Sequence, residues 1–273
     1  MPELPEVEVI RRGLEPLLAA KTFAAPRILF AGSIRHPSAA QFRRRLPGRR
    51  IDGLGRIGKY LIIGLDCGEL VVHLRMTGRL VFLERGKPPA RHLRAALPFS
   101  DGSMLYFSDM RKFGGLWLLE SAAERDLTGL GRLGPDIYEQ VDRHRFEVLM
   151  RSRCRARLKP LLLDQRFVAG LGNIYVDESL FRSRLHPCRA VSTLSREEIA
   201  RLYEAIRSVL EEGIGCGGTS ARDYVDARGE QGDFQNRLSV YGHKGRLCNC
   251  GTAVTRITVA GRGTYYCPQC QKE

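Results

Sequence analysis

Residues 128–136, TGLGRLGPD, separate two parts of the sequence that differ in character. Three glycines and one proline among nine residues are typical of a connector, so we place a linker over residues 128–140. The part before it, residues 1–127, is rich in short β-like runs, and the part after it has helical periodicity. We therefore expect an α+β protein with two main domains.

The first part begins with a helix and continues as strands. Apolar residues recur at helical spacing over residues 5–18, and Pro5 suits the first turn of a helix. Short β-rich runs follow, separated by turn signals such as Asp101-Gly102. These runs are residues 60–65, 70–74, 80–83, 104–108 and 116–119. The pattern predicts an antiparallel β-sandwich or barrel.

The second part reads as helices. Ser195 and Glu198 have the spacing of a capping box, and an apolar face continues from them to about residue 212. Two shorter helices are expected around residues 156–164 and 172–183. We assign residues 141–236 to this helical domain.

Two loops in the helical part are candidates for function. Gly170-Leu171-Gly172-Asn173 precedes a helix, so its backbone N–H groups could hold a phosphate, although a simple glycine turn is the alternative. Residues 213–236 are rich in glycine and lack periodicity. A loop this long inside a compact domain is more often functional than incidental.

The charge of the chain indicates a polyanionic partner. Its 273 residues carry 44 Lys and Arg against 30 Asp and Glu, a net charge of +14. Nucleic acid and an anionic membrane surface both fit such a charge, as does a basic protein with no such partner. No apolar run approaches the roughly 18 residues of a membrane span. Residues 41–60 hold seven Lys and Arg against one Asp, for which a solvated loop is the simplest interpretation.

Cysteine usage indicates a reducing compartment. The first residues, MPELPEVEV, carry acids and no base, which does not suit a secretory signal, so we expect a cytoplasmic protein. Metal ligation is then favoured over disulfides for clustered cysteines. Four cysteines are isolated in the sequence, and we interpret them as small buried apolar residues. They are Cys67, Cys154, Cys188 and Cys216.

The other four cysteines predict a zinc site in residues 237–273. Cys248 and Cys250 form one pair, and Cys267 and Cys270 form the second pair after sixteen residues. Two thiolate pairs joined by a hairpin suit a tetrahedral structural Zn²⁺, with unligated cysteines as the alternative. The first pair is C-x-C instead of C-x-x-C, which could strain one ligand or let His243 replace a thiolate. This segment has six basic residues and one acid, so it should face a polyanion.

The N-terminus could supply a nucleophile. Removal of Met1 would leave Pro2 as a secondary amine, which is far less protonated at pH 7 than a lysine. Such an amine can attack a sugar carbon and form an iminium ion, with Glu3 and Glu6 moving protons nearby. The alternative is structural, because Pro2 and Pro5 stiffen a helix entry and acids are favoured there by the helix dipole.

Six motifs, in order along the whole chain, together resemble the bacterial formamidopyrimidine-DNA glycosylases. They are MPELPEVE at the start, Lys59 in GKY, His73–Met76, Arg111–Gly114, Gly172–Tyr175 and the cysteine tail. The resemblance implies a β-sandwich with flanking helices, a helix–two-turn–helix domain and a zinc ribbon. It also implies that DNA crosses between the domains, and it favours the catalytic interpretation of Pro2.

The resemblance assigns roles in catalysis. Pro2 would attack C1′ of the damaged nucleotide and form a Schiff base, and Glu3 would be the acid/base partner, supported by Glu6. Lys59 would donate a proton in β-elimination and contact phosphate. Arg262 would bind phosphates around the lesion and assist δ-elimination.

The resemblance also assigns DNA contacts. Met76, Arg111 and Phe113 match a wedge that fills the space of an everted base, although the spacing alone would indicate core packing for Met76 and Phe113. Residues 217–224 match a loop that closes over an oxidised purine, and Thr77 receives no role. The remaining positions that match DNA-contacting residues are His73, His92, Lys159, Asn173 and Tyr241.

We therefore expect a monomeric, bifunctional DNA glycosylase and AP lyase of base excision repair, acting on the bacterial nucleoid. It would remove 8-oxoguanine and formamidopyrimidines from duplex DNA by β,δ-elimination, and would contain one structural zinc ion. One alternative is an endonuclease VIII-type enzyme for oxidised pyrimidines, and another is a non-catalytic DNA-binding homologue. Leu4 and the long loop over residues 213–236 favour the purine enzyme.

Overall fold

A computed structural model describes residues 2–84, 91–220 and 224–272. The chain folds into two compact units. One contains Met1–Arg132 and Ile214–Gln235, and the other contains Leu133–Gly213 and Asn236–Glu273. The division after Arg132 falls within the linker predicted over residues 128–140. Residues 214–235, which we expect in the helical domain, pack in the first unit, where the Phe82 N–H donates to the Ala227 carbonyl.

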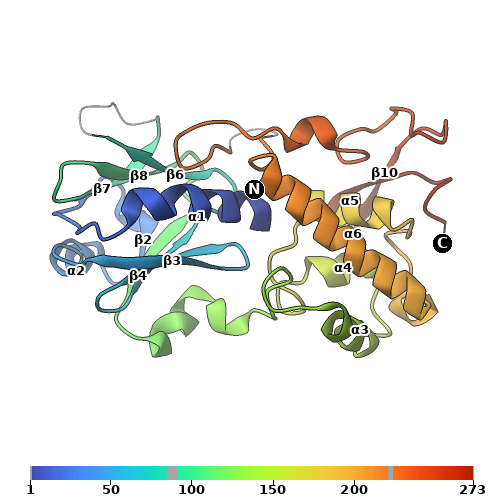
Figure 1. Ribbon diagram of the computed structural model, residues 1–273, viewed down its shortest axis with the longest axis horizontal. Helices are drawn as coiled ribbons and strands as arrows, with labels where there is room; N and C mark the ends of the chain where they lie inside the picture. The colour runs from blue at the N-terminus through green and yellow to red at the C-terminus, as the bar shows by residue number, and fades with distance from the viewer. Residues whose placement is uncertain (1, 85–90, 221–223, 273) are drawn as a thin grey trace. The chain divides into compact units, whose positions relative to one another are not determined.

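The first unit is a β-sandwich (Figure 1). One sheet has the strand order β1-β7-β8-β6, and the other has the order β2-β9-β5-β4-β3. All neighbouring strands are antiparallel except β2 and β9, which are parallel. The strands are β1 Arg27–Ile28, β2 Ile34–His36, β3 Ile51–Ile57, β4 Tyr60–Leu65, β5 Glu69–His73, β6 Gly78–Leu83, β7 Leu93–Pro98, β8 Met104–Asp109 and β9 Gly115–Leu119.

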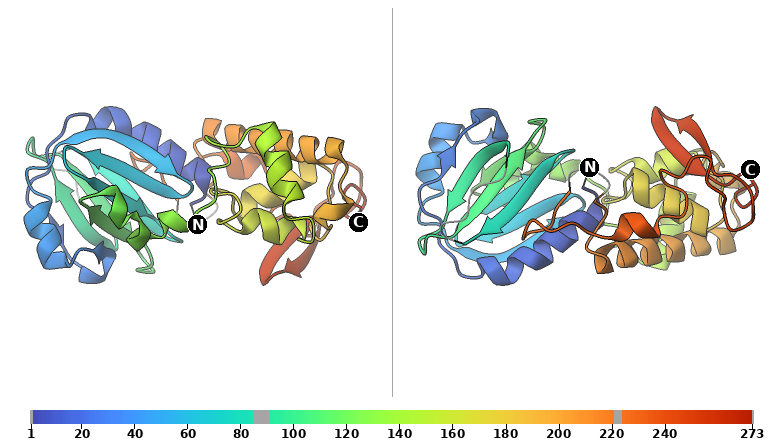
Figure 2. Two further views of the ribbon diagram at one scale, coloured as in Figure 1. Left: turned by 90° about the horizontal axis from the view of Figure 1, so that it is seen from below. Right: turned by 90° about the horizontal axis from the view of Figure 1, so that it is seen from above.

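Two helices cover opposite sides of this sandwich. Helix α1 (Leu4–Leu18) contacts the edge strands β3 and β6 of the two sheets, and α2 (Ala39–Arg45) contacts β1 and β2 at the other edges. Figure 2 shows α1 running along the strands. The apolar face of α1 joins side chains from both sheets in one buried core. The predicted helix over residues 5–18 and all five predicted strands are therefore confirmed.

The second unit is helical and carries a β-hairpin (Figure 1). Its helices are α3 Arg143–Arg151, α4 Leu158–Leu163, α5 Asn173–Arg182 and α6 Arg196–Gly215, the last two residues of which fall in the first unit, and its hairpin pairs β10 Thr255–Val259 with β11 Arg262–Tyr266. The capping box before α6 is present, because the Glu198 N–H donates to Ser195 Oγ and the Ser195 N–H donates to Glu198. Helix α3 is not among the predicted helices. Within the described ranges, no helix has the length and apolar character needed to cross a membrane.

Candidate functional site

The start of α1 is buried and tightly bonded. Pro2 is buried, and Glu3 and Glu6 are only 3% and 1% exposed. One carboxylate oxygen of Glu6 accepts the Glu3 N–H at 2.7 Å, and the other accepts the Thr219 N–H at 2.8 Å. Glu6 thus holds the backbone next to Pro2 and, at the same time, the glycine-rich loop of the first unit.

Lys59 lies in the turn between β3 and β4, and an ion pair ties this turn to α1. The Arg56 guanidinium donates to Glu8 at 3.1 Å and to the Gly58 carbonyl at 3.0 Å. Both side chains of the pair are almost fully buried. Burial alone would raise the pKa of Glu8, but the guanidinium groups of Arg11, Arg12 and Arg56 lower it to about 2. The carboxylate therefore stays charged and keeps the Lys59 turn against the first turns of α1.

His73 supports the following loop from within the protein. Its Nδ1 accepts the Arg75 N–H at 2.9 Å, and its ring meets Tyr60 edge to face. Burial, together with the nearby charges of Arg75 and Lys59, lowers the pKa of His73 to about 3. The imidazole is therefore neutral at pH 7, as the bond that it accepts requires.

The proposed wedge residues are exposed and touch one another. Met76 is 43% exposed and Phe113 is 50% exposed, so the interpretation of these residues as core packing is wrong. The Arg111 guanidinium lies 4.8 Å from the centre of the Phe113 ring, and its Nη1 lies 3.1 Å from Met76 Sδ. Two loops, one after β5 and one after β8, thus present one apolar and cationic cluster. His92, another predicted contact, is also exposed and has a φ of 60°.

Two of the predicted phosphate-binding residues lie close together in the second unit. Asn173 begins α5, and its Nδ2 donates to the Gly263 carbonyl of the hairpin at 2.9 Å. Arg262, the residue before Gly263, is exposed directly after the hairpin turn, where Ala260 and Gly261 both have positive φ. Asn173 Oδ1 is buried and has no hydrogen-bond partner among the described residues. A bound molecule or water commonly satisfies such an atom.

Lys159 does not reach the surface. Its side chain is 0% exposed, and its ammonium lies 2.6 Å from Asp177 Oδ1 and 3.3 Å from the Gly263 carbonyl oxygen. The expected direct contact of Lys159 with DNA does not fit this burial. The lysine instead joins α4 and α5 to the hairpin that carries Arg262, because a buried charge is stable only beside a partner.

Tyr241 is held by a second buried acid. The Glu178 carboxylate accepts the N–H groups of Ser239, Val240 and Tyr241 at 2.8 to 2.9 Å. The Tyr241 ring packs against Tyr265 of β11 at 5.2 Å between centres. The half-buried Tyr241 is therefore fixed at the base of the hairpin.

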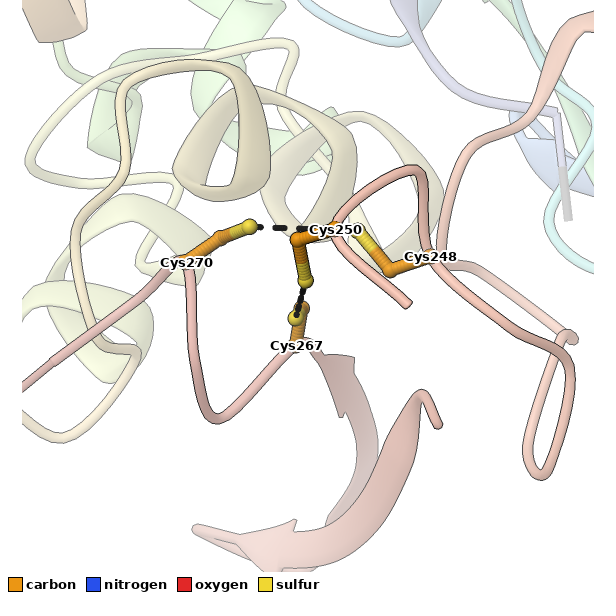
Figure 3. A group of neighbouring side chains, drawn as sticks. All are labelled: Cys248, Cys250, Cys267 and Cys270. Carbon is orange, nitrogen blue, oxygen red and sulfur yellow. Dashed lines mark hydrogen bonds between the residues drawn. The ribbon is translucent and has the colours of Figure 1, made fainter. Parts of the chain in front are cut away.

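The four clustered cysteines form the predicted metal site (Figure 3). Their sulfur atoms all lie within 4.8 Å of one another, with Cys248 and Cys270 at 3.8 Å and Cys250 and Cys267 at 3.5 Å. A tetrahedron of thiolates about 2.3 Å from a zinc ion has edges of about 3.8 Å. The four cysteines therefore fit one structural zinc ion, and both cysteines of the short C-x-C pair are among its four ligands.

His243 does not replace a thiolate of the metal site, because both of its ring nitrogens have other hydrogen-bond partners. Its ring nitrogens lie within hydrogen-bond distance of the Ser239 carbonyl and of Arg246.

Gly251, with a φ of 83°, allows the chain to turn directly after Cys250. The knuckle is closed there by the Gly251 N–H, which donates to the Cys248 carbonyl at 2.8 Å.

The loop over residues 217–224 is described in part, since residues 221–223 lie outside the described residues. Gly217 and Gly218 both have positive φ, and a Cβ on Gly218 would lie 2.8 Å from the Tyr224 ring. The Tyr224 hydroxyl lies 3.4 Å from the Glu6 carbonyl oxygen. Burial raises the pKa of Tyr224 and keeps it neutral. Both described ends of this loop therefore contact the segment that follows Pro2.

The interpretation of the isolated cysteines is wrong. Cys67 and Cys154 are exposed, and Cys188 and Cys216 are only partly buried. Cys67 sits between Asp66 and Gly68 in the turn that joins β4 to β5. A turn residue faces solvent whatever its hydrophobicity, which explains the failure.

Several residues of the site are absent from our sequence-based predictions. Asp109, Asp177 and Glu178 are buried acids that hold the loops and hairpin carrying the predicted residues. Arg56 is the buried partner of Glu8. The one available signal is an acid at the end of a β-rich run, as in Leu105–Asp109, and such a pattern does not reveal the partner.

Three family models match most of the chain. Residues 1–116 match the formamidopyrimidine-DNA glycosylase N-terminal domain, and residues 133–225 match the formamidopyrimidine-DNA glycosylase H2TH domain. Residues 249–272 match the zinc finger found in FPG and IleRS. The helix–two-turn–helix and zinc-ribbon parts of the predicted fold are thereby confirmed.

Curated relatives carry the same family name along their full length. The formamidopyrimidine-DNA glycosylase of Heliobacterium modesticaldum is 49% identical, with all of both chains aligned. That of Pelotomaculum thermopropionicum is 46% identical over 100% of this chain and 99% of its own.

Solved structures agree. A complex of Lactococcus lactis Fpg with abasic-site DNA is 36% identical, covers 100% of both chains and has a TM-score of 0.90. A point mutant of the Lactococcus lactis protein bound to Fapy-dG-containing DNA gives the same identity and coverage with a TM-score of 0.89. Fold, zinc site and sequence thus agree that the chain belongs to the formamidopyrimidine-DNA glycosylase family, the DNA glycosylases of base excision repair that also have AP lyase activity.

Proposed function

We propose that this protein removes oxidised purines, such as 8-oxoguanine and formamidopyrimidines, from duplex DNA and then cuts the strand by β,δ-elimination, with Pro2 as the nucleophile. The observation that carries the proposal is the buried start of α1, where Glu6 bonds the Glu3 N–H and the Thr219 N–H. A nucleophile needs a fixed position near the atom that it attacks. The names of the relatives and the Fapy-dG in a solved complex support a purine lesion as the substrate.

Pro2 suits covalent catalysis because its secondary amine, once Met1 is removed, is partly neutral at pH 7. Its nitrogen loses its proton and forms a bond to C1′ while the bond between C1′ and the damaged base breaks, and the base leaves with a proton. The C1′–O4′ bond then breaks, O4′ takes up a proton, and the open sugar is joined to Pro2 as an iminium ion. The resulting iminium ion accepts electrons as C2′ loses a proton and the C3′–O bond breaks. A second elimination, in which C4′ loses a proton, breaks the C5′–O bond and frees the remnant from the DNA. Water then hydrolyses the bond between C1′ and the Pro2 nitrogen, which releases the remnant and restores the amine.

Acids and bases of the chain would move the protons in these steps. We assign the transfer at the sugar to Glu3, which is buried next to Pro2, and the support of that segment to Glu6. Lys59 would donate a proton in β-elimination from the turn that Arg56 fixes to α1. Arg262 would bind phosphate and assist δ-elimination, aided by phosphate contacts from Asn173 and Tyr241.

The exposed cluster of Met76, Arg111 and Phe113 suits a wedge. An enzyme that acts on a base within a duplex must evert it and lose stacking and pairing. Apolar side chains that enter the vacated space offset part of this loss, and the Arg111 guanidinium can hydrogen-bond the orphaned partner base. His92 is exposed and would contact the backbone, and His73 would act through the loop that it supports.

Trapping with borohydride tests the nucleophile. The protein should form a covalent complex with an 8-oxoguanine duplex when borohydride reduces the Schiff base. Pro2→Glu, which blocks removal of Met1, should abolish the complex, and Pro16→Ala, an exposed change later in α1, should leave it intact. A complex of equal yield from Pro2→Glu would overturn the assignment of Pro2, and its absence from the unaltered protein would exclude the covalent mechanism altogether.

Parallel excision assays test the lesion class. We expect 8-oxoguanine and formamidopyrimidine duplexes to be cut faster than a thymine glycol duplex under single-turnover conditions. Faster cutting of thymine glycol would instead support the endonuclease VIII-type alternative. Binding to every duplex without any cutting would support the non-catalytic alternative.

The proposal extends to the setting of the enzyme. The relatives are bacterial proteins, and we infer a monomer that acts on the nucleoid in the cytoplasm. The net charge of +14 supports sequence-independent contact with phosphates during the search for lesions. Light scattering of the protein with and without a short duplex tests the monomer directly.

A further inference from the structure

We propose that Thr77, Asp109 and Arg35 are positioning residues that hold the two wedge loops in one preformed arrangement. The loop after β5 carries Met76, and the loop after β8 carries Arg111 and Phe113. The inference rests on the proposed function, because it assumes that these three side chains enter the duplex. It assigns a role to Thr77, which the resemblance leaves without one.

Asp109 binds both loops with its buried carboxylate. Asp109 is only 1% exposed, and the Thr77 hydroxyl donates to its Oδ1 at 2.5 Å. The Arg111 N–H donates to the same oxygen at 3.1 Å, and the Gly114 N–H donates to Oδ2 at 2.7 Å. One carboxylate therefore fixes both ends of the segment that carries Arg111 and Phe113.

The Thr77 hydroxyl connects this segment to the Met76 loop. Its Oγ1 accepts the Arg111 N–H at 3.1 Å while it donates to Asp109. Thr77 follows Met76 directly and is 8% exposed, so the bond is shielded from water. A valine at this position would keep the shape of the side chain and remove the hydroxyl that bonds both Asp109 and the Arg111 N–H.

Arg35 holds the opposite side of the same segment. This residue of β2 places its Nη2 at 3.3 Å from the Lys112 carbonyl oxygen and at 3.2 Å from the carbonyl oxygens of Phe113 and Gly114. The N–H groups of this segment therefore donate to Asp109, and its carbonyl groups accept from Arg35. Gly114 is required for this fit, because a Cβ there would lie 2.9 Å from the Phe107 ring.

Backbone strain indicates that the arrangement is enforced. Arg75 and Lys112, which precede Met76 and Phe113, have φ values of 53° and 62°. Residues other than glycine persist in this left-handed region only where their surroundings over-determine the conformation. The hydrogen bond from the Arg75 N–H to His73 Nδ1 also holds the backbone of the loop that carries Met76. The exposed side chains of the wedge are thus ordered by contacts within the protein.

A preformed wedge should matter most where a paired base must be everted. Loops that are disordered before binding must be ordered when DNA binds, which costs free energy. In the unaltered protein the loops are already ordered by folding, so binding does not include this cost. An abasic site has no base to evert, so its cleavage depends far less on the wedge. Loss of the scaffold should therefore separate the excision of 8-oxoguanine from the cleavage of a preformed abasic site.

The experiment compares Thr77→Val and Arg35→Met with the unaltered protein. Thr128→Val is the matched control, because the buried Thr128 hydroxyl also bonds two backbone groups of the first unit, the Arg125 carbonyl and the Leu130 N–H. Three readouts are used for each protein. They are single-turnover excision of 8-oxoguanine opposite cytosine, the fluorescence of 2-aminopurine next to the lesion, and borohydride trapping on a preformed abasic site.

We expect Thr77→Val and Arg35→Met to slow excision and the 2-aminopurine phase by about tenfold or more, because small misplacements of positioned groups have effects of this size. Trapping on the abasic site should stay within about twofold, Thr77→Ser should restore excision, and Thr128→Val should change none of the three readouts. If Thr77→Val does not fold, Arg35→Met decides, since that side chain is exposed.

Equal losses on both substrates, or an unchanged excision rate in Thr77→Val and Arg35→Met, would overturn the inference. Failure of the unaltered protein to be trapped would instead contradict the proposed function. The two failures are therefore distinguishable in the same set of reactions.

Discussion

The ammonium of Lys159 lies 2.6 Å from the Asp177 carboxylate, and both side chains are 0% exposed. The second oxygen of Asp177 accepts the Tyr265 N–H at 3.0 Å, and Lys159 lies 3.3 Å from the Gly263 carbonyl. One ion pair from α4 and α5 therefore holds the hairpin on both sides of Thr264. Because Arg262 directly precedes Gly263, the pair also sets where this phosphate-binding candidate lies.

Replacing one member of this pair should be costly. Lys159→Met leaves Asp177 buried without its counter-charge, which should lower the free energy of unfolding by about 3–5 kcal/mol. The double variant Lys159→Met/Asp177→Leu should recover much of that loss, because it removes both buried charges. Urea denaturation of each full-length variant measures its free energy of unfolding. The exposed Lys272→Met is the control, and equal stability of Lys159→Met and this control would contradict the prediction.

Glu6→Gln should weaken the start of α1. Both Glu6 oxygens accept backbone N–H groups, from Glu3 and from Thr219. A glutamine amide has one acceptor, so its NH₂ group would face one of these donors, at a cost of about 1–3 kcal/mol. Stability in urea and the rate of Schiff-base trapping should both fall. Glu15→Gln changes an exposed acid of the same helix and should alter neither.

Acid should destabilise the first unit through His73. Its folded pKa of about 3 lies below the ordinary value of 6.5, so the unfolded chain binds the extra proton between these values. The stability gained by a neutral His73 is complete above about pH 6.5 and is lost as the pH falls toward 3. The slope is about 1.4 kcal/mol per pH unit.

His73→Asn checks this slope, because the asparagine oxygen can still accept the Arg75 N–H and does not titrate. Unfolding in urea at several pH values between 5 and 7 should show a smaller loss of stability in the variant than in the unaltered protein. Below pH 4.5, Glu8 should add to the loss in both proteins, because its folded pKa is lowered to about 2. Parallel curves above pH 5 would show that His73 does not titrate on unfolding.

Removal of zinc should unfold the ribbon and spare the sandwich. The core around Cys248 and Cys267 is small, containing Val240 and Val254 with few partners, so the metal should supply much of its stability. A chelator or Cys250→Ser should increase amide exchange over residues 237–272 and leave α1 and the strands protected. DNA affinity should fall about tenfold or more, or about 1.4 kcal/mol.

Cys188→Ser is the control for this experiment, since Cys188 lies outside the cluster. It should retain one zinc ion per chain by elemental analysis and normal exchange. A preparation with no zinc and a protected hairpin would contradict the structural role of the metal.

Local patterns were sufficient for much of the fold. The helical spacing over residues 5–18 and the β-rich runs report which face of each element is buried, and α1 and the strands lie where these patterns place them. The two cysteine pairs predict the zinc site because four thiolates at such spacings have few other uses. The position of Pro2 behind Met1 fits a structural role as well as a catalytic one, and its proposed role as nucleophile came from the family resemblance.

The tertiary structure alone decided which charged and apolar residues are exposed. Lys159 looks like a surface lysine in the sequence and is buried, because Asp177, 18 residues later, neutralises it. Met76 and Phe113 look like core residues and are exposed, because Asp109 and Arg35 hold their loops outward. Burial of a charge or exposure of an apolar group depends on partners from distant segments, and local spacing contains no information about them.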